Sequence, residues 1–236
     1  MGSVTQNLQG PLQSGNKIIS SDQEKANLLN SFFASQSVLD TNRARLPSRQ
    51  STQSRVVINS LVVQPEDIYK ILSSLDPSKS TGPDGIGNML LKEAALPVSK
   101  PLAELLNFCL SLGTFPNPWK LAQVIPIHKK GDPLQCTNYR PISLLPCISK
   151  VFERVLFNHI FDFLKTHNLI NKHQSGFIPC DSTVNQLIGI CHKLCGHLDN
   201  NEDVIGVFLD LTKAFDKVWH QGLLYKLNDI GIKGNI

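Results

Sequence analysis

Hydrophobic residues recur at helical spacing along most of this chain, whereas runs with the pattern of strands are few. Helical periodicity predicts six amphipathic helices, at residues 22–38, 65–75, 89–112, 148–164, 183–198 and 222–230. The third of them is expected to be interrupted near Pro97 and Pro101, because proline removes a backbone donor and crowds the preceding turn. Strand-like patterns occur at residues 121–127, 140–145 and 203–209. We therefore predict a mixed α and β fold (α+β) that is rich in helices.

The segments between these elements are polar. Residues 1–21 are rich in Gly, Ser, Asn and Gln, and we predict that they are disordered or form a linker. Residues 40–55 contain four arginines and no acidic residue after Asp40, which indicates a basic linker. Residues 76–85 are a turn-rich loop that must end the helix before it, and residues 130–133 form a turn between the first two strands.

Positive charge is concentrated in one stretch of the sequence. The whole chain has 23 basic and 19 acidic residues, which gives a net charge of +4. The stretch from residue 120 to residue 154 has the same excess, because its six basic residues are opposed only by Asp132 and Glu153. These six are Lys120, Lys129, Lys130, Arg140, Lys150 and Arg154. Such a concentration is typical of a phosphate-binding face, although composition alone fits a solvated charged surface better.

Apolar runs and cysteines bear on the protein's location and chemistry. No run approaches the roughly 18 apolar residues of a membrane helix, and no signal peptide is evident, so we expect an intracellular protein, cytoplasmic or nuclear, that is not secreted. The six cysteines are expected to be free thiols. Cys191 and Cys195 lie near two histidines, which suggests a zinc site. Their i, i+4 spacing in an apolar stripe favours buried thiols instead.

Asp210 directly follows the apolar run at residues 203–209, which would place its carboxylate at the C-terminal tip of a strand. Phosphoryl transfer with two metal ions uses aspartates at such positions as hard oxygen ligands. A helix N-cap before the turn at Thr212 explains the same residue equally well. Asp216, six residues further on, is expected to be structural.

Five stretches of the sequence resemble motifs of one protein family, the reverse transcriptases of non-long-terminal-repeat (LINE-type) retrotransposons, and especially the jockey-like elements. In chain order they are Gly82–Ile86, residues 113–132 with 138–145, Lys150–Leu156, Gln174–Phe177 and Phe208–His220. The second resembles the fingers hairpin of these enzymes, and the last resembles their first palm motif. Because all five follow the family's order between residues 57 and 236, the chain is identified as a member of this family.

The resemblance implies a domain organisation and a metal cofactor. Residues 1–56 would be an N-terminal helix and basic linker, residues 57–200 the fingers region, and residues 201–236 the truncated start of the palm. Asp210 would be a catalytic aspartate that binds Mg²⁺, with the Leu211 carbonyl as a second ligand. Phe215 would lie under the sugar of the incoming nucleotide, where its bulk excludes a 2′-hydroxyl, and core packing is compatible with that role.

The resemblance also implies contacts with nucleotide and template. Arg140 would grip the nucleotide triphosphate, and Lys130, with Lys129 beside it, would match the lysine at the tip of the hairpin. This chemistry is reasonable, because arginine offers a fixed fork for phosphate oxygens and lysine a mobile charge. The residues expected to contact the template, or to shape the junction of fingers and palm, are Gln174, Gly176 and Phe177.

Two departures from the family pattern bear on function. Cys180 and Asp181 stand where a glycine and a basic residue or histidine are usual, so we expect a strained turn and a weaker template contact. The sequence also contains no Tyr-x-Asp-Asp motif. The expected partners are an RNA template, a DNA primer and deoxynucleoside triphosphates, and no membrane. The predicted function is therefore part of an RNA-directed DNA polymerase, inactive alone, with a non-catalytic nucleic-acid-binding remnant as the alternative.

Overall fold

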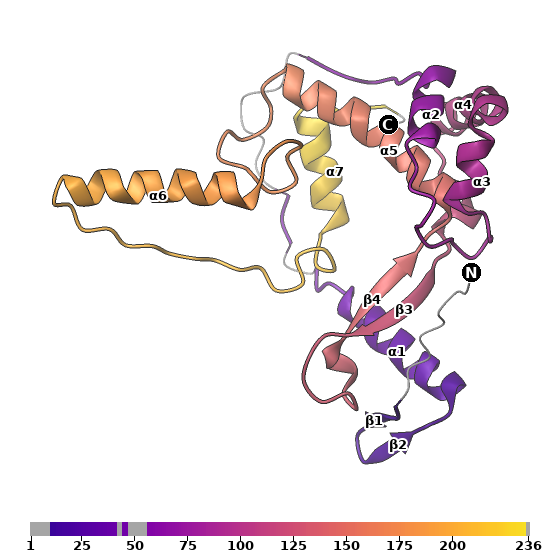
Figure 1. Cartoon of the computed structure of the whole chain (residues 1–236), viewed down its shortest axis with the longest axis horizontal. Coiled ribbons are helices and arrows are strands. Elements are labelled where there is room, and N and C mark those ends of the chain that lie inside the picture. The colour runs from indigo at the N-terminus through magenta and orange to yellow at the C-terminus, as the bar shows by residue number, and fades with distance from the viewer. Residues whose placement is uncertain (1–9, 42–43, 47–55, 235–236) are drawn as a thin grey trace. The chain divides into compact units, whose positions relative to one another are not determined.

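The structure is a computed structural model, and it describes residues 10–41, 44–46 and 56–234 (Figure 1). The chain forms two compact units. The main unit contains residues 1–160 and 215–236, and the second unit contains residues 161–214. Helices predominate and the strands are short, which confirms the predicted mixed α and β fold. Among the described residues, no helix has both the length and the apolar character needed to cross a membrane.

A small hairpin precedes the first helix, contrary to the prediction that residues 1–21 lack structure. Strands β1 (Leu12–Ser14) and β2 (Lys17–Ile19) pair antiparallel around Gly15, whose φ of 58° suits glycine. Helix α1 (Asp22–Gln36) follows, close to the predicted bounds. The hairpin is stable because it is covered: Leu12 and Leu29 are buried in a small apolar cluster with Cys136. Most of the predicted basic linker at 40–55 lies outside the described residues.

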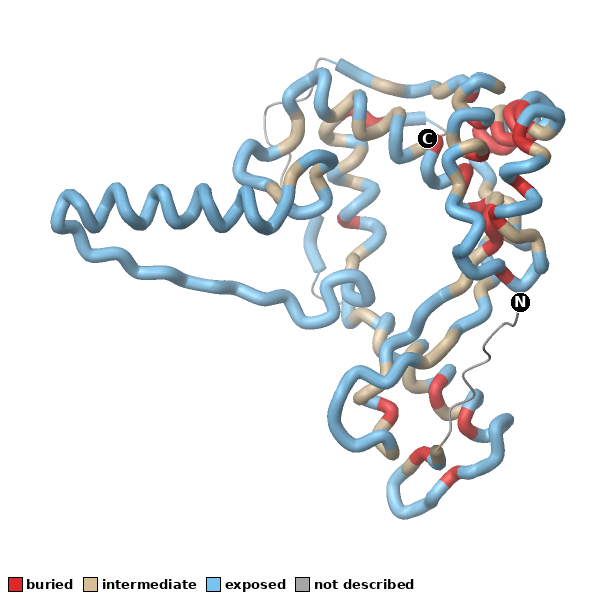
Figure 2. Tube along the Cα trace, in the orientation of Figure 1, coloured by how far each residue is buried: buried red, intermediate tan, exposed pale blue. Residues whose placement is uncertain are grey.

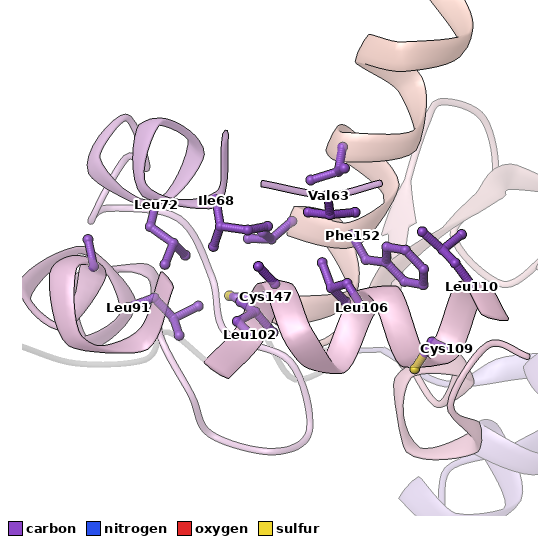
Figure 3. Packing of buried hydrophobic residues seen from close by; sticks show 14 residues of the cluster. Val63, Ile68, Leu72, Leu91, Leu102, Leu106, Cys109, Leu110, Cys147 and Phe152 are labelled. Carbon is purple, nitrogen blue, oxygen red and sulfur yellow. The ribbon is translucent and has the colours of Figure 1, made fainter. Parts of the chain in front are cut away.

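Four helices form the larger core (Figure 3). They are α2 (Pro65–Ser73), α3 (Asn88–Glu93), α4 (Ala95–Ser111) and α5 (Cys147–Thr166). Their apolar faces meet around Ile68, Leu106 and Phe152, which are 0 to 2% exposed. Asn107 closes one side, because its side-chain amide bonds both the N–H and the carbonyl of Val63, at 2.8 and 2.9 Å.

The predicted interruption of residues 89–112 is confirmed in the turn before Pro97 and is wrong at Pro101. The break falls at Ala94, between α3 and α4, whereas Pro97 and Pro101 both lie within α4. Pro97 is tolerated because it occupies the first turn, where the backbone N–H has no helical partner. Pro101 is inside the helix. It has no N–H to donate to the carbonyl four positions earlier, which belongs to Pro97. In one continuous helix Pro97 would have no N–H for the Glu93 carbonyl and would crowd it, so the break at Ala94 lies in the turn that Pro97 disfavours.

Strands β3 (Gln123–His128) and β4 (Tyr139–Leu144) form the second hairpin, which confirms the first two predicted strands. They pair antiparallel, with Ile125 opposite Ile142 and Ile127 opposite Arg140. Short 3-10 turns precede each strand, at Asn117–Lys120 and Cys136–Asn138. The turn at residues 130–133 is confirmed, and Gly131 adopts a φ of 87° there.

The loop at residues 76–85 requires a glycine at position 82. A Cβ atom at Gly82 would lie 2.5 Å from the backbone nitrogen of Pro146, so only glycine allows this approach of two main chains. Gly85, three residues later, has a φ of 72°. The loop therefore places its backbone against the connection between β4 and α5.

Helix α7 (His220–Asp229) returns the chain to the main unit, near the predicted position. After the helix, Ile232 forms a parallel bridge with Ile58. Two hydrogen bonds of 2.9 Å support this bridge, from Ile58 N–H to the Gly231 carbonyl and from Lys233 N–H to the Ile58 carbonyl. Ile232 is also buried.

The second unit contains α6 (Thr183–Asp199), whose N-terminus is capped by the Ser182 hydroxyl, which accepts from the Asn185 N–H. None of the residues of α6 is buried (Figure 2). The prediction that Cys191 and Cys195 are buried is therefore wrong, although all six cysteines are free thiols as expected. The helix has the predicted apolar stripe, but nothing among the described residues covers it.

The predicted strand at residues 203–209 is also absent from the structure, where this segment is irregular and exposed (Figure 2). Phe208 and Leu209 are 92% and 90% exposed. The physical reason is that a strand needs a neighbour for its backbone N–H and carbonyl groups, and no described segment pairs with this one. The apolar pattern favours a strand, but no strand forms here.

Candidate nucleotide and nucleic-acid site

The turn of the β3–β4 hairpin is fixed by its own polar residues. The Asp132 carboxylate accepts from the Leu134 N–H at 2.9 Å, and the Asn138 side chain donates to the Asp132 carbonyl at 2.9 Å. The Lys129 N–H donates to the Asn138 carbonyl at 2.8 Å, which extends the strand pairing by one step. The Tyr139 hydroxyl donates to the Pro133 carbonyl at 2.7 Å. These bonds give the tip of the hairpin a definite shape.

Lys129, Lys130 and Arg140 are brought together at this tip, and all three are exposed. Side chains alternate between the faces of a strand, so Lys129 falls on the face that Ile127 and Arg140 share, while Lys130 begins the turn. Among the ion pairs of the described residues, none involves these three cations. Their charges are therefore available to an anion.

Asn138 and Tyr139 are important for this tip, and the sequence analysis gave them no role of their own. Burial raises the pKa of the Tyr139 phenol, with further contributions from Cys136 and Asp132. The phenol therefore remains a neutral donor to the Pro133 carbonyl. Their position in the sequence could have indicated this role. They stand directly before Arg140 and follow the turn at residues 130–133, which their side chains close by hydrogen bonds.

Asp210 and Leu211 lie in the second unit, in the irregular segment that ends before the turn at residues 212–217. Both are exposed, and Asp210 does not lie at the tip of a strand as predicted. No group of three or more histidine, cysteine or acidic residues that could hold a metal ion is found in the described part of the chain. Asp210 by itself does not fit a metal site.

Phe215 lies in that turn, at the point where the chain re-enters the main unit, and its side chain is 80% exposed. Packing in the core is therefore not its role in this structure. Lys213, two residues earlier, has a φ of 54°, which contributes to the tight turn.

Gln174, Gly176 and Phe177 form a second turn region before α6. The Gln174 side chain donates to the Gly176 carbonyl at 3.2 Å. Phe177 has a φ of 62°, and a Cβ atom at Gly176 would meet nothing within 4 Å. The Ser175 hydroxyl oxygen also lies 2.5 Å from the Gln186 side-chain oxygen, which brings the turn close to the start of α6.

The two departures at Cys180 and Asp181 have visible consequences. Cys180 has a φ of 67°, a conformation that favours glycine, so the expected strain at this turn is confirmed. Hydrogen bonds, first from the Ser175 hydroxyl and then from the Ser182 N–H, lower the pKa of the Asp181 carboxyl. A negative charge therefore stands at this turn at neutral pH.

The proposed site residues are divided between the units. The main unit holds Lys129, Lys130, Arg140 and Phe215, and the second unit holds Gln174, Gly176, Phe177, Asp210 and Leu211. Within the main unit the two lysines and the arginine share one hairpin, which is the clearest cluster of cations among the predicted residues.

Comparison with known proteins identifies the family. The family described as reverse transcriptase (RNA-dependent DNA polymerase) matches residues 127–235, from near the end of β3 to beyond the end of α7. The chain therefore belongs to the reverse transcriptases. Within this class its relatives are RNA-directed DNA polymerases of non-long-terminal-repeat retrotransposons, including jockey.

Three relatives from Drosophila melanogaster show the extent of the similarity. The probable RNA-directed DNA polymerase from transposon BS is 37% identical over 179 residues, which are 72% of this chain and 19% of the relative. The RNA-directed DNA polymerase from mobile element jockey is 36% identical over 162 residues, 68% of this chain and 18% of the relative. The probable polymerase from transposon X-element is 35% identical over 165 residues, with shares of 70% and 18%. The chain spans about a fifth of these relatives' length.

Proposed function

We propose that this chain provides the nucleotide-binding hairpin and the first catalytic aspartate of an enzyme that copies an RNA template into DNA by extending a DNA primer. The observation that carries the proposal is the tip of the β3–β4 hairpin, where Arg140 and two lysines are exposed and belong to none of the ion pairs of the described residues. A triphosphate carries several negative charges on closely spaced oxygens, and an arginine fork with nearby ammonium groups matches it. Arg140 and Lys130 are the proposed nucleotide ligands, and Lys129 contacts template or nucleotide beside them.

Asp210 is proposed as a contributor to catalysis, together with the Leu211 carbonyl. Reverse transcriptases as a class use divalent metal ions, and Mg²⁺ is the proposed ion here. One exposed carboxylate and a carbonyl supply too few ligands to hold it, so we assign no reaction step to the ion. Phe215 is proposed to contact the sugar of the incoming nucleotide, since its ring is exposed and follows Asp210 by five residues.

Gln174, Gly176 and Phe177 are proposed to contact the template. Their turn exposes a ring and an unobstructed backbone, which suit stacking and close approach to a nucleic-acid strand. The negative charge at Asp181 weakens phosphate contact nearby. The alternative, a non-catalytic nucleic-acid-binding remnant, is not favoured, because the hairpin residues suited to a triphosphate are all present.

A chimera tests this proposal, because the matched relatives are much longer than this chain. Residues 57–236 would replace the corresponding segment of the RNA-directed DNA polymerase from mobile element jockey, and primer extension on an RNA template would be measured. We expect an active chimera whose activity falls at least 100-fold with Asp210→Ala and 10-fold or more with Arg140→Ala, the order of magnitude for loss of a transition-state contact.

Asp203→Ala is the matched control, since it removes another aspartate of the same segment, and it should leave extension within about twofold. An active chimera that tolerates Asp210→Ala would refute the assignment of the catalytic aspartate. Unaltered apparent affinity for the nucleotide in Arg140→Ala would refute the assignment of the hairpin.

A further inference from the structure

A pocket of about 530 Å³ lies between the C-terminal half of α2 and the first half of α5. The two helices pack together in the main core, and Figure 1 shows them beside each other. The apolar part of the lining comes from Ile71, Leu75 and Val151. The polar part comes from exposed side chains of both helices and the loop after α2: Lys70, Ser74, Asp76, Lys150, Arg154 and Asn158.

Positive charge predominates in this lining. Lys70, Lys150 and Arg154 contribute three cations, and none of them belongs to an ion pair of the described residues. The one acidic residue is Asp76, which already has partners. Its carboxylate accepts from the Ser78 hydroxyl at 2.7 Å and from the Ser78 N–H at 2.9 Å, and it lies 3.6 Å from the Lys79 ammonium group.

The hydrogen bonds from Ser78, hydroxyl first and then N–H, lower the pKa of the Asp76 carboxyl, so it is charged at neutral pH. The pocket therefore has three positive charges and one negative charge, and the negative one is paired with Lys79 outside the lining.

The end of α2 would oppose an anion if its carbonyl groups were unsatisfied, because the C-terminus of a helix is its negative end. The last carbonyls of α2 have partners instead: the Ser74 N–H bonds the Lys70 and Ile71 carbonyls, and the Leu75 N–H bonds the Leu72 carbonyl at 3.2 Å. In the loop after α2, side chains of α3 bond the next two carbonyls, from Lys92 to Leu75 at 3.2 Å and from Asn88 to Asp76 at 2.9 Å. The pocket therefore keeps its excess of positive charge, although it lies beside the C-terminal half of α2.

We propose that this pocket binds successive phosphate groups of a single-stranded RNA backbone, at a site separate from the β3–β4 hairpin. Three cations spread over two helices suit several phosphates along a strand better than one compact anion. None of the nine lining residues is aromatic, so the pocket has no ring for a base to stack on. Binding is therefore indifferent to sequence. The choice of RNA, rather than another polyphosphate, rests on the proposed function.

Lys70 gives this proposal its content. It lies on another helix, about 80 positions before the two cations that it joins. The basic stretch at residues 120–154 is thus not one surface. Lys129, Lys130 and Arg140 are at the hairpin, whereas Lys150 and Arg154 form the pocket with a lysine from another helix.

The test uses the 236-residue chain and a labelled 12-nucleotide oligouridylate, with fluorescence anisotropy at several salt concentrations. The variant Lys70→Gln/Lys150→Gln/Arg154→Gln removes the charges and keeps most of each side-chain stem. If each cation meets one phosphate, the slope of log affinity against log salt should flatten by roughly 2 units, at about 0.7 per phosphate for single strands. An unchanged slope would overturn the proposal.

The matched control is Lys100→Gln/Lys165→Gln/Lys193→Gln, which changes net charge equally at exposed lysines of α4, α5 and α6. It should leave the slope within about half a unit. An equal loss in control and pocket variants would show that only net charge matters, and would overturn the proposal. Should the pocket variant fail to fold, Asp76→Asn is the second probe, and it should tighten binding roughly two- to fivefold, the range for one exposed charge pair.

Two further arms identify the ligand and separate the proposals. A DNA oligonucleotide of the same length should show the same dependence on the three cations, because the phosphates are shared. Tripolyphosphate that binds where oligonucleotides do not would overturn the assignment to a nucleic-acid backbone. An inactive chimera would count against the proposed polymerase function and would leave these binding measurements unaffected.

Discussion

The main-chain N–H of Gln13 donates a 2.8 Å hydrogen bond to the carbonyl oxygen of Leu134, which joins strand β1 to the loop between β3 and β4. A second bond, of 3.1 Å, runs from the Gln135 side chain to the Gln13 side chain. Behind these polar contacts, Leu12, Leu29 and Cys136 are buried together. The N-terminal hairpin and α1 therefore support the loop that precedes Arg140, although they lie outside the residues that match the family.

Leu29→Ala tests this support. Removal of a buried leucine side chain should cost about 2–4 kcal/mol, because the cavity is not refilled. We expect hydrogen exchange of the Gln13 amide to accelerate together with that of Lys129, at the other side of the same loop. Asn30→Ala, at an exposed position of the same helix, should leave both rates unchanged. Accelerated exchange in α1 alone would show that the loop holds its shape without it.

Gly82→Ala should destabilise the main unit strongly. Its new Cβ atom would lie 2.5 Å from the Pro146 nitrogen, and backbone cannot move aside as a side chain can. We expect a loss of at least about 2 kcal/mol in chemical denaturation. Gly189→Ala is the control, because nothing lies within 4 Å of that position in α6, and there alanine should stabilise the helix by up to about 1 kcal/mol. Equal stability of the two variants would contradict the close approach.

Thiol reactivity should separate the cysteines into two groups of three. The exposed group should react with iodoacetamide within minutes under native conditions, and it comprises Cys180, Cys191 and Cys195. The buried group should react only on unfolding, and it comprises Cys109, Cys136 and Cys147. Burial also raises the pKa of the Cys136 thiol, which reduces its reactive thiolate at any given pH. Mass spectrometry of labelled peptides gives the order, and protection of Cys191 would mean that α6 is covered in solution.

The 236-residue chain alone should show no polymerase activity. One proposed carboxylate ligand cannot position two divalent ions, and the sequence contains no Tyr-x-Asp-Asp motif. Primer extension on RNA or DNA templates, with Mg²⁺ or Mn²⁺, should remain at background. Extension that disappears in Asp210→Ala would show that this chain assembles a working site without further ligands.

The segment at residues 203–211 should exchange its amide hydrogens without protection and should promote association. Its apolar side chains are exposed, and unpaired extended backbone readily pairs with another chain. Ile205→Lys/Leu209→Lys should lower light scattering at equal concentration, whereas Met89→Lys/Leu96→Lys, at exposed positions of folded helices, should not. The Ile58 and Lys233 amides, both hydrogen-bonded, serve as protected references. Slow exchange across residues 203–211 would contradict this prediction.

Local pattern was sufficient where the partner of an element is close in sequence. The β3–β4 hairpin was predictable, because its two apolar runs flank one turn with Gly131. The β1–β2 hairpin was missed, because strands of three residues are too short to show a period, and only the Gly15–Asn16 pair signals the turn. At residues 203–209 the predicted strand is wrong, because strand formation also requires a partner, which a local pattern does not report.

The same limit applies to the site. The place of Arg140 and Lys130 on one exposed hairpin could be predicted because that hairpin is continuous in sequence, whereas their contact with a nucleotide stays a prediction from the family resemblance. The pocket of Lys70, Lys150 and Arg154 could not, since it depends on how α2 packs against α5. No spacing rule relates residue 70 to residue 150, and the two helices meet because both contribute to the same apolar core, α2 through Ile68 and Leu72 and α5 through Val151 and Val155.

The bridge between Ile58 and Ile232 makes residues 161–214 an insertion in a unit whose two sequence segments are already joined. The entropy of closing such an insertion increases only with the logarithm of its length, so doubling it costs about 0.6 kcal/mol. A longer or shorter insertion should therefore change the free energy of unfolding of the main unit only slightly. The main unit can also stay folded while the inserted residues change conformation. Asp210 is one of these inserted residues.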